Sequence, residues 1–389
     1  MDEGSGFQAA AEAPGLAELR RRIDGLNEEI LGLLQRRGDV VMEIARVKRE
    51  NGLDGYDPAR EEEMLHRVTR DLEGAFGPAE IKEVFHSIFR VSLDIQDEER
   101  RKRLRVRKQG GKPAEVRVGS VVIGNGAPVL FAGPCSVETP EQMDETARTL
   151  ARFSCPLILR AGAFKPRTSP QAFQGLRERG LEILREAADR YGLLVVTEVL
   201  DASTLAVVAE HADMIQVGSR NMYNTELLKA LGKIGKPVLL KRGFMATLEE
   251  FLLSAEYILS HGNPDVVLCE RGIRTFEPWT RNTLDIAAIP LLKSETDLPV
   301  IVDVSHALGR KDVLAPCAKA ALAAGADGIM IEAHPAPDLA LSDGFQQIDL
   351  GELEKFVIEV GMMAAPVKLA GENGAVPRPA AAYRSGVDR

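Results

Sequence analysis

Eight short apolar runs, each followed by a loop and then a segment of helical periodicity, occupy most of this chain. The runs are residues 129–132, 157–160, 194–197, 214–217, 238–240, 266–269, 300–302 and 328–331. Helical patterns follow them, for example over 170–191, 246–260, 310–324 and 350–362. Eight alternations of strand and helix predict an α/β fold, a closed parallel (β/α)₈ barrel of the TIM type. A doubly wound open sheet is the alternative, and the number of strands makes it the weaker one.

The first hundred residues have a different pattern. Apolar residues recur at helical spacing from Leu16 to about Glu50 without a proline, which predicts one helix about 50 Å long. Asn51-Gly52 would end it, and Asp57-Pro58 would begin a second helix that reaches about Leu72. A third is expected from Ala79 to beyond Glu99. So long a helix has too few neighbours within the chain, so we expect an intertwined dimer, and a homodimer or homotetramer for the whole protein.

These patterns divide the chain of 389 residues, since a barrel needs roughly 250. We expect a disordered leader over 1–15, an all-α three-helix domain over 16–103, a linker over 104–115, the barrel over 116–367 and a disordered tail over 368–389. Within this scheme, 116–123 alternates like one short strand with a turn at 124–126. The basic stretch 100–112 suits a solvated helix end and a linker, and a nucleic-acid patch is the less favoured interpretation.

Charge and cysteine content exclude several classes of protein. The net charge is −9, whereas nucleic-acid binders are usually basic, so no nucleic-acid partner is expected. The four cysteines have no close spacing, which fits a reducing compartment. Neither a signal peptide nor a membrane-spanning apolar stretch is visible, so we expect a cytoplasmic protein without a membrane partner.

Five basic side chains lie at or just after the ends of four of the predicted strands. The working residues of barrel enzymes lie just past the C-terminal ends of strands. The basic residues there are Arg160, Lys165, Arg220, Lys241 and Arg271. Gathering them costs repulsion unless anions are bound, and phosphates suit arginine and lysine. A single such residue would usually be solvated surface, but the set predicts a phosphate-binding mouth.

Four possible metal ligands also follow the strands: Cys135, His306, Glu332 and Asp343. Each alone has a plainer interpretation, such as a buried thiol or a loop cap. Three follow the first, seventh and eighth strands, which become neighbours when a barrel closes, and Asp343 is in the loop after the eighth. Mixed sulfur, nitrogen and oxygen donors favour Mn, Fe, Co or Zn over Ca or Mg.

The barrel resembles the type I DAHP synthases, in the subgroup close to the 3-deoxy-manno-octulosonate 8-phosphate synthases. The resemblance covers about 115–365 and depends on Gly133-Pro134-Cys135-Ser136, Lys165-Pro166-Arg167-Thr168-Ser169, Cys269-Glu270-Arg271-Gly272 and Ser305-His306. It implies a divalent metal cofactor, with manganese favoured, on the four ligands above. The sequence departs from the family at Val304, where proline is usual, and at Ser219, where alanine is usual. We expect these two differences to have only local effects.

The resemblance also implies two substrates. Phosphoenolpyruvate would bind Arg160, Lys165, Arg220, Lys241 and Arg271, with Ser219 beside them, and erythrose 4-phosphate would face Lys165, Pro166, Arg167 and Thr168. The implied reaction is an aldol-like condensation in which carbon 3 of phosphoenolpyruvate attacks the metal-polarised aldehyde. Water then adds at carbon 2 and phosphate leaves. Lys165 is the candidate for acid/base work or for positioning the water.

Polar residues of the helical region form a second set: Arg20, Arg37, Lys48, Asp57, Arg60, Glu61, Ser92 and Gln96. Arg37 and Lys48 would lie about 20° apart on one helix face, whereas Arg20 lies about 100° away and would serve the partner's site. Surface charges on amphipathic helices are the plain alternative.

Residues 16–99 resemble the all-helical chorismate mutases. The resemblance implies that Arg20, Arg37 and Arg60 clamp the carboxylates of chorismate and that Lys48 and Gln96 stabilise the ether oxygen. Glu61 would take a hydroxyl group, and Asp57 and Ser92 would complete the pocket. Arg37, Lys48, Glu61 and Gln96 are therefore the candidate catalytic residues.

Alternatives remain open for both domains. The helical domain could be a sensor through which chorismate or prephenate inhibits the synthase, with or without mutase turnover. The barrel could use another phosphosugar such as arabinose 5-phosphate, although the Lys165–Thr168 motif and the helical domain argue against it. A non-enzymatic scaffold is disfavoured by the complete residue sets.

Overall fold

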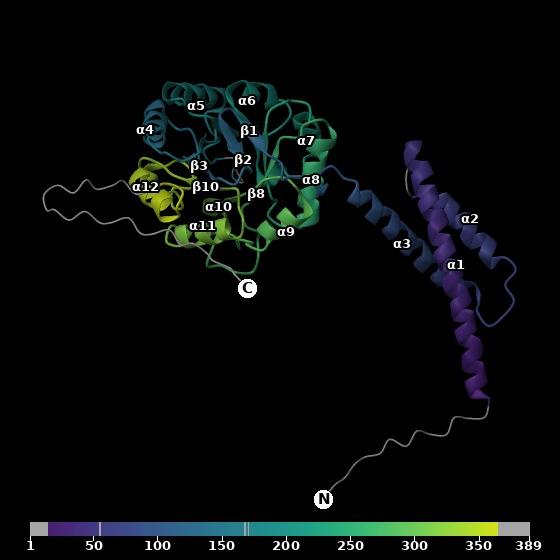
Figure 1. Ribbon diagram of the computed structural model, residues 1–389. Coiled ribbons are helices and arrows are strands. Elements are labelled where there is room, and N and C mark those ends of the chain that lie inside the picture. Colours follow the sequence, from purple (N-terminus) through teal and green to yellow (C-terminus); the bar gives the residue numbers. More distant parts are fainter. Residues whose placement is uncertain (1–14, 54–55, 167–168, 170, 365–389) are drawn as a thin grey trace, which may run out of the picture. The chain divides into compact units, whose positions relative to one another are not determined.

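The computed structural model describes residues 15–53, 56–166, 169 and 171–364 (Figure 1). The chain forms two compact units whose boundary lies between Leu104 and Arg105. The expected tail 368–389 lies outside the described residues, as does the expected leader apart from Gly15. None of the described helices combines the length and apolar character needed to cross a membrane.

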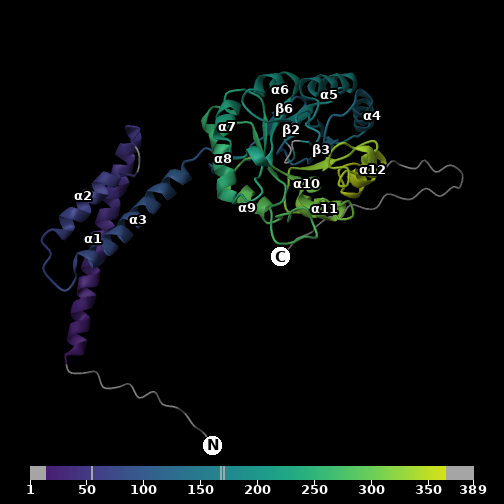
Figure 2. The ribbon, with the colours of Figure 1, turned by 180° about the vertical axis from the view of Figure 1, so that it is seen from behind.

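Three helices form the first unit, as predicted: α1 (Leu16–Glu50), α2 (Pro58–Thr69) and α3 (Pro78–Lys102). Asn51 ends α1, and the side chain of Asp57 caps α2 by accepting a 3.0 Å hydrogen bond from the Arg60 amide. Proline at the first position of α2 and α3 fits a helix start, where no amide partner is lost. Helix α3 packs against both α1 and α2 (Figures 1 and 2).

This helical unit has little interior of its own. In its described residues only Val41 and Phe89 are buried. Apolar side chains of α1 remain more than half exposed, for example Ile23 at 57% and Leu33 at 56%. Such a continuous apolar surface is unusual on a protein that works alone.

Eight parallel strands close into a barrel in the second unit, in the order β10-β3-β4-β5-β6-β7-β8-β9. The closing pair joins β10 to β3, with Gly328 opposite Val129. The open sheet is thereby excluded. The strands are β3 (Val129–Gly133), β4 (Leu157–Arg160), β5 (Val195–Val199), β6 (Met214–Val217), β7 (Val238–Lys241), β8 (Val266–Glu270), β9 (Val300–Asp303) and β10 (Gly328–Glu332).

Helices surround the barrel on its outside (Figures 1 and 2). They are α4 (Pro140–Leu150), α5 (Arg177–Tyr191), α6 (Leu205–His211), α7 (Thr225–Leu231), α8 (Leu248–Ser260), α9 (Ala288–Glu295), α10 (Val304–Leu308), α11 (Leu314–Ala323) and α12 (Leu350–Glu359), with the short 3₁₀ turns η1 (Ser219–Asn221) and η2 (Pro337–Leu339). The expectation of a helix from 170 is wrong, since α5 begins at Arg177. Gly175 lies just before it with φ of 85°, and a Cβ there would come within 2.1 Å of the Ala163 carbonyl oxygen. The chain must turn there before a helix can start.

A hairpin replaces the single strand expected over 116–123. Strands β1 (Val116–Val118) and β2 (Val121–Ile123) pair antiparallel, and Gly119 between them has φ of 53°. Val116, Val118 and Ile123 join the apolar core of the barrel, beside Val129. Val129 is the first residue of β3, so the hairpin covers the end of the barrel opposite the strand C-termini.

The expected linker is attached to the barrel along much of its length. The Val106 amide donates a 2.8 Å hydrogen bond to Glu256 of α8, and the Val106 side chain is buried. The Arg107 guanidinium pairs with Glu249 at the start of α8 and with Glu295 at the end of α9. The Ala114 amide donates to the Asp297 carbonyl. The free stretch between the units is therefore shorter than 104–115.

Candidate functional site

The C-terminal ends of the barrel strands surround a polar cavity of about 70 Å³. Nine of the residues singled out from the sequence line it: Arg160, Lys165, Pro166, Ser219, Arg220, Lys241, Arg271, His306 and Asp343. Arg167 and Thr168 lie outside the described residues. The strands thus bring basic groups that are up to 111 positions apart in the sequence (271 − 160) to one place.

Two of the basic side chains are held by buried carboxylates. Nη1 of Arg160 lies 2.8 Å from Oε1 of Glu332 and also donates a 2.7 Å hydrogen bond to the Pro134 carbonyl. Lys241 pairs with Asp303. All four side chains are buried, and each charge is compensated by its partner within the protein. The geometry of these cations is fixed before any ligand arrives.

Lys165 is also buried and points at Cys135. Its Nζ lies 2.9 Å from the carbonyl oxygen of Cys135 and 3.1 Å from the Sγ. Pro166 follows it in the cavity wall. The ammonium group thereby stands between the anion-binding side of the cavity and the possible metal ligands.

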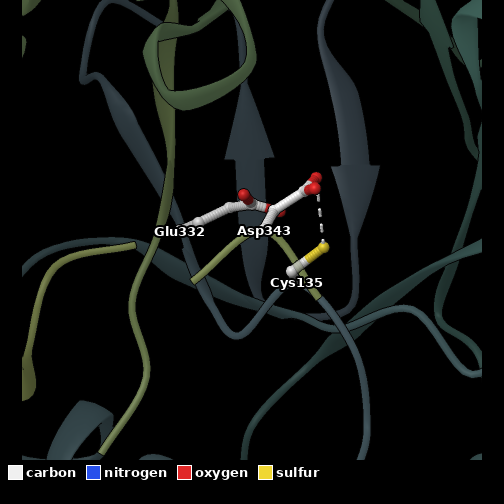
Figure 3. Close-up of side chains that lie close together, drawn as sticks. All are labelled: Cys135, Glu332 and Asp343. Atoms are coloured by element: carbon white, nitrogen blue, oxygen red, sulfur yellow. Dashed lines mark hydrogen bonds between the residues drawn. The ribbon is translucent and has the colours of Figure 1, made fainter. Parts of the chain in front are cut away.

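Three of the four predicted metal ligands form a compact group. Donor atoms of Cys135, Glu332 and Asp343 lie within 4.8 Å of one another. Figure 3 shows the three side chains converging, with Sγ of Cys135 facing the Asp343 carboxylate at 3.7 Å. One thiol and two carboxylates match the mixed donor set expected for Mn, Fe, Co or Zn.

His306 stands beside this group. Its Nδ1 is 2.8 Å from Oδ2 of Asp303, and its Nε2 is 3.5 Å from Oε1 of Glu332. The contact with Asp303 occupies Nδ1 and leaves Nε2 facing Glu332, as outer carboxylates do for metal-binding histidines. The donors present therefore fit a divalent ion with His306 as the fourth ligand.

Burial and neighbouring charges shift the pKa values of these groups, in directions that favour metal binding at His306 and Asp343 but not at Cys135. Burial lowers the pKa of the His306 imidazole, which favours the neutral ring that binds metals. Burial and the nearby Glu332 raise the pKa of the Cys135 thiol. Burial by itself would raise the pKa of Asp343, but Arg281 and His306 outweigh it and bring the value to about 2. An anionic Asp343 is thus secured across the neutral range.

The loop that carries Asp343 is fixed to the loop after β3. Asp343 has φ of 47°, an uncommon value for a residue other than glycine. The hydroxyls of Ser342 and Ser136 are 2.6 Å apart, and Gln347 accepts a 2.8 Å hydrogen bond from the Cys135 amide. These contacts bring Asp343 next to Cys135 despite 208 positions of sequence separation.

Four side chains of the cavity were not among the predicted site residues: Glu198, Gln216, Phe244 and Arg281. Glu198 and Gln216 stand at strand ends, so their position was a usable signal. Arg281 lies well beyond β8, and its Nη1 reaches Asp343 at 3.2 Å. Only the folded loop reveals that contact.

In the helical unit, the structure joins Arg37 to Ser92. The Arg37 guanidinium donates to the Ser92 hydroxyl and lies 5.6 Å from the centre of the Phe89 ring. Burial lowers the pKa of Arg37. Arg37 and Ser92 both line an apolar groove of about 770 Å³ between α1 and α3. A cation at the edge of an apolar groove suits an amphipathic anion such as a small carboxylic acid.

The other predicted residues of this unit are placed differently. Gln96 lines a second groove, beside Arg46 and Arg49. Asp57 caps α2, and Arg60 forms a surface ion pair with Glu63 at 2.5 Å. Arg20 is exposed, whereas Lys48 and Glu61 are half-buried. One copy of the chain therefore unites Arg37 with Ser92 but does not place Gln96 in the same groove.

Comparisons with known proteins agree with both units. The DAHP synthetase I family matches residues 98–367, and the chorismate mutase type II family matches residues 19–97. The phospho-2-dehydro-3-deoxyheptonate aldolase of Thermotoga maritima is 55% identical over 64% of this chain and 73% of its own length. The 2-dehydro-3-deoxyphosphooctonate aldolase of Granulibacter bethesdensis is 35% identical over 64% and 94%.

A solved structure supports the same assignment. The crystal structure of the DAHP synthase of Thermotoga maritima superposes with a TM-score of 0.62 at 55% identity, covering 64% of this chain and 72% of that one. The family match spans well over half of the 389 residues. This chain therefore belongs to the DAHP synthetase I family and carries a chorismate mutase type II domain ahead of its barrel.

Proposed function

We propose that the barrel condenses phosphoenolpyruvate with erythrose 4-phosphate and water to give DAHP and phosphate, at the cavity lined by Arg160, Lys165 and Lys241. The observation that carries the proposal is the concentration of cations there. Six basic side chains line the cavity, against the carboxylates of Glu198 and Asp343 in its wall and those of Glu332 and Asp303, which pair with Arg160 and Lys241, so two more cations than carboxylates remain. Two phosphorylated substrates need such an excess, because their own charges repel.

The basic residues divide between the two substrates. Arg160, Arg220, Lys241 and Arg271, with Ser219 beside them, would hold phosphoenolpyruvate, and Lys165, Pro166, Arg167 and Thr168 would face erythrose 4-phosphate. Fixing both anions in one cavity converts a bimolecular encounter into an oriented one. Carbon 3 of phosphoenolpyruvate then forms a bond to the aldehyde carbon.

Proton transfer is assigned to Lys165. As the new bond forms, the aldehyde oxygen gains a proton; water adds at carbon 2, and the bond from carbon 2 to the phosphate oxygen breaks. Nζ of Lys165 lies in the cavity and within 3.1 Å of Cys135, so it reaches both the aldehyde side and the phosphate side. We therefore assign it to deliver the proton or to orient the water.

A divalent ion, with manganese favoured and Fe, Co or Zn as alternatives, would be held by Cys135, His306, Glu332 and Asp343, and it would act as a Lewis acid on the aldehyde. Asp303 holds the His306 ring in the orientation that ligation requires. Arg160 contacts the ligand Glu332, and this contact links the phosphate side of the cavity to the group of metal ligands.

Phosphate release tests the synthase. The purified chain is given phosphoenolpyruvate with erythrose 4-phosphate or with arabinose 5-phosphate. We expect release with the tetrose and little with the pentose, since the relative at 55% identity is named for the heptonate and the one at 35% for the octonate. Equal or faster release with arabinose 5-phosphate would reverse the choice of acceptor.

For the helical unit we propose the rearrangement of chorismate to prephenate. The Arg37–Ser92 pair beside the apolar groove supports it, because the guanidinium suits a carboxylate and the groove suits the ring. Arg20, Arg37 and Arg60 would bind carboxylates, with Lys48, Asp57, Glu61 and Gln96 completing the site. Arg37→Ala should abolish mutase turnover and leave phosphate release unchanged, whereas Arg21→Ala, in an exposed pair with Glu18, should preserve both.

We also propose that this unit dimerises and that it mediates feedback by chorismate or prephenate. The exposed apolar face of α1 supports dimerisation, because a second copy would cover it. Sedimentation of the full chain at several concentrations measures the assembly. Removal of residues 1–104 should abolish inhibition of the barrel by prephenate, and inhibition that persists would exclude the sensor role.

The four free cysteines support a reducing compartment such as the cytoplasm.

A further inference from the structure

Three guanidinium groups gather on a single aromatic ring at the mouth of the barrel. The guanidinium carbons of Arg271 and Arg274 each lie 4.7 Å from the centre of the Phe244 ring, and that of Arg220 lies 5.5 Å away. Phe244 follows β7, Arg220 follows β6, and Arg271 and Arg274 follow β8. Because β7 lies between β6 and β8 in the barrel, the ring stands centrally among them.

These three arginines differ from Arg160, Lys241 and Arg242 in how their charge is compensated. Arg160, Lys241 and Arg242 each pair with a buried carboxylate. Among the ion pairs of the described residues, none involves Arg220, Arg271 or Arg274. Arg220 and Arg274 are exposed, so solvent screens part of their repulsion, whereas Arg271 is buried. The electron-rich face of the ring attracts all three groups, most strongly where water is excluded, at Arg271.

Desolvation is strongest at Arg271. Its side chain is buried, and burial lowers its pKa. Its Nη1 donates a 3.2 Å hydrogen bond to the Gly272 carbonyl, and the Phe244 ring covers another part of the group. A buried guanidinium with one weak neutral acceptor and an aromatic face is free to accept an anion without first breaking an ion pair.

The turn that carries the ring is held in place. The Arg274 amide donates a 2.7 Å hydrogen bond to the Phe244 carbonyl, which joins the loop after β8 to the loop after β7. The Arg242 Nε donates at 3.0 Å to the Ala246 carbonyl and closes the turn around Phe244. The Gly243 amide faces the Met222 sulfur at 3.0 Å. The turn is therefore fixed on both sides of the ring.

We propose that Phe244 is a positioning residue for the reaction, an aromatic platform that orients Arg220 and Arg271 toward the phosphate of phosphoenolpyruvate. Arg274 belongs to the same group and holds the outer part of the platform. This inference rests on the proposed function of the barrel. The platform lowers the cost of ordering the long arginine side chains when the anion binds, so it acts on binding more than on the chemical step.

Phe244→Leu tests the platform because it keeps an apolar side chain and removes the π face. We expect KM for phosphoenolpyruvate to rise about 10-fold while kcat changes by less than about 3-fold. The dissociation constant of inorganic phosphate, measured by calorimetry on the full chain, should rise by a similar factor. Phe244→Tyr and Phe244→Trp should restore both values. Phe276→Leu is the matched control, since Phe276 is 98% exposed, and it should change neither.

Two results would overturn the platform: an unchanged KM and phosphate affinity in Phe244→Leu, or a defect of equal size in Phe244→Leu and Phe244→Tyr, which would mean packing alone. Failure of the proposed function has a different signature. If wild-type protein binds phosphate, loses that binding in Phe244→Leu and forms no DAHP from phosphoenolpyruvate and erythrose 4-phosphate, then the platform stands and the assigned reaction is wrong.

Discussion

The Nζ of Lys165 lies 3.1 Å from the Sγ of Cys135, although the two residues follow different strands of the barrel. Cys135 belongs to the group of possible metal ligands, and Lys165 lines the cavity that collects the basic side chains. This contact connects the possible metal ligands with the cavity that would bind the phosphorylated substrates. A cation at this point is near the thiol, near the ligand carboxylates and in reach of a phosphorylated substrate.

Lys165→Met should reduce kcat for DAHP formation by at least about 100-fold, because proton transfer by a positioned group commonly contributes that much. The substitution keeps the length of the side chain and removes its charge. Lys229→Met is the control, since Lys229 forms a surface pair with Glu226 at 2.8 Å. Steady-state assays at saturating substrates give the measurement. Near-native turnover in Lys165→Met would remove Lys165 from the mechanism.

Chelation should separate the two activities. Treatment with a strong chelator is expected to abolish DAHP formation and leave chorismate rearrangement intact, because the possible ligands lie in the barrel alone among the described residues. Adding Mn²⁺ back should restore synthase activity in wild-type protein but not in Cys135→Ser. Metal content by elemental analysis accompanies each assay. Full synthase turnover in protein shown to be metal-free would contradict the prediction.

Arg242→Ala should destabilise the barrel by about 3–5 kcal/mol, because it leaves a buried carboxylate without its partner. The Arg242 Nη1 lies 2.8 Å from Glu270, which is fully buried, and 2.9 Å from Asp285. Chemical unfolding followed by fluorescence measures the change. Arg310→Ala, which removes a surface pair with Asp312, should cause no measurable loss. Equal stability of the two variants would show that the Arg242 pairs contribute little.

Two truncated chains test the attachment of the linker. A chain that begins at Arg105 should be more stable than one that begins at Val116 by about 1.5–3 kcal/mol, since the second loses the burial of Val106. It also loses the pairs of Arg107 with Glu249 and Glu295. Thermal unfolding of both, at equal protein concentration, gives the comparison. Identical midpoints would mean that 105–115 adds nothing to the barrel.

The positions of the barrel strands could be predicted from the sequence, because a barrel strand is buried on both faces and appears as a short apolar run. The runs at 157–160 and 214–217 became β4 and β6 without a change of bounds. The predicted first residues of the helices were less accurate. α5 starts at Arg177 because the loop with Gly175 packs against the Ala163 carbonyl, a contact outside any local pattern.

The candidate site was partly predictable for the same reason. Parallel strands place their C-terminal residues at one end of a barrel, so Arg160, Lys241 and Arg271 were expected to meet there, and all three line the cavity. Their roles toward substrates stay predictions. Arg281 and Phe244 were not found, because one depends on a long loop and the other is an aromatic residue whose partners come from neighbouring strands.

The sequence by itself determined the order of elements, the closed barrel and the residue types at its mouth, because periodicity and strand ends are local properties of the chain. Only the tertiary structure decided which of those residues touch. It brought Asp343 to Cys135 across 208 positions, set three arginines on Phe244, and attached Val106 to α8. Such contacts depend on loop conformation and on packing between distant segments, and neither leaves a periodic trace in the sequence.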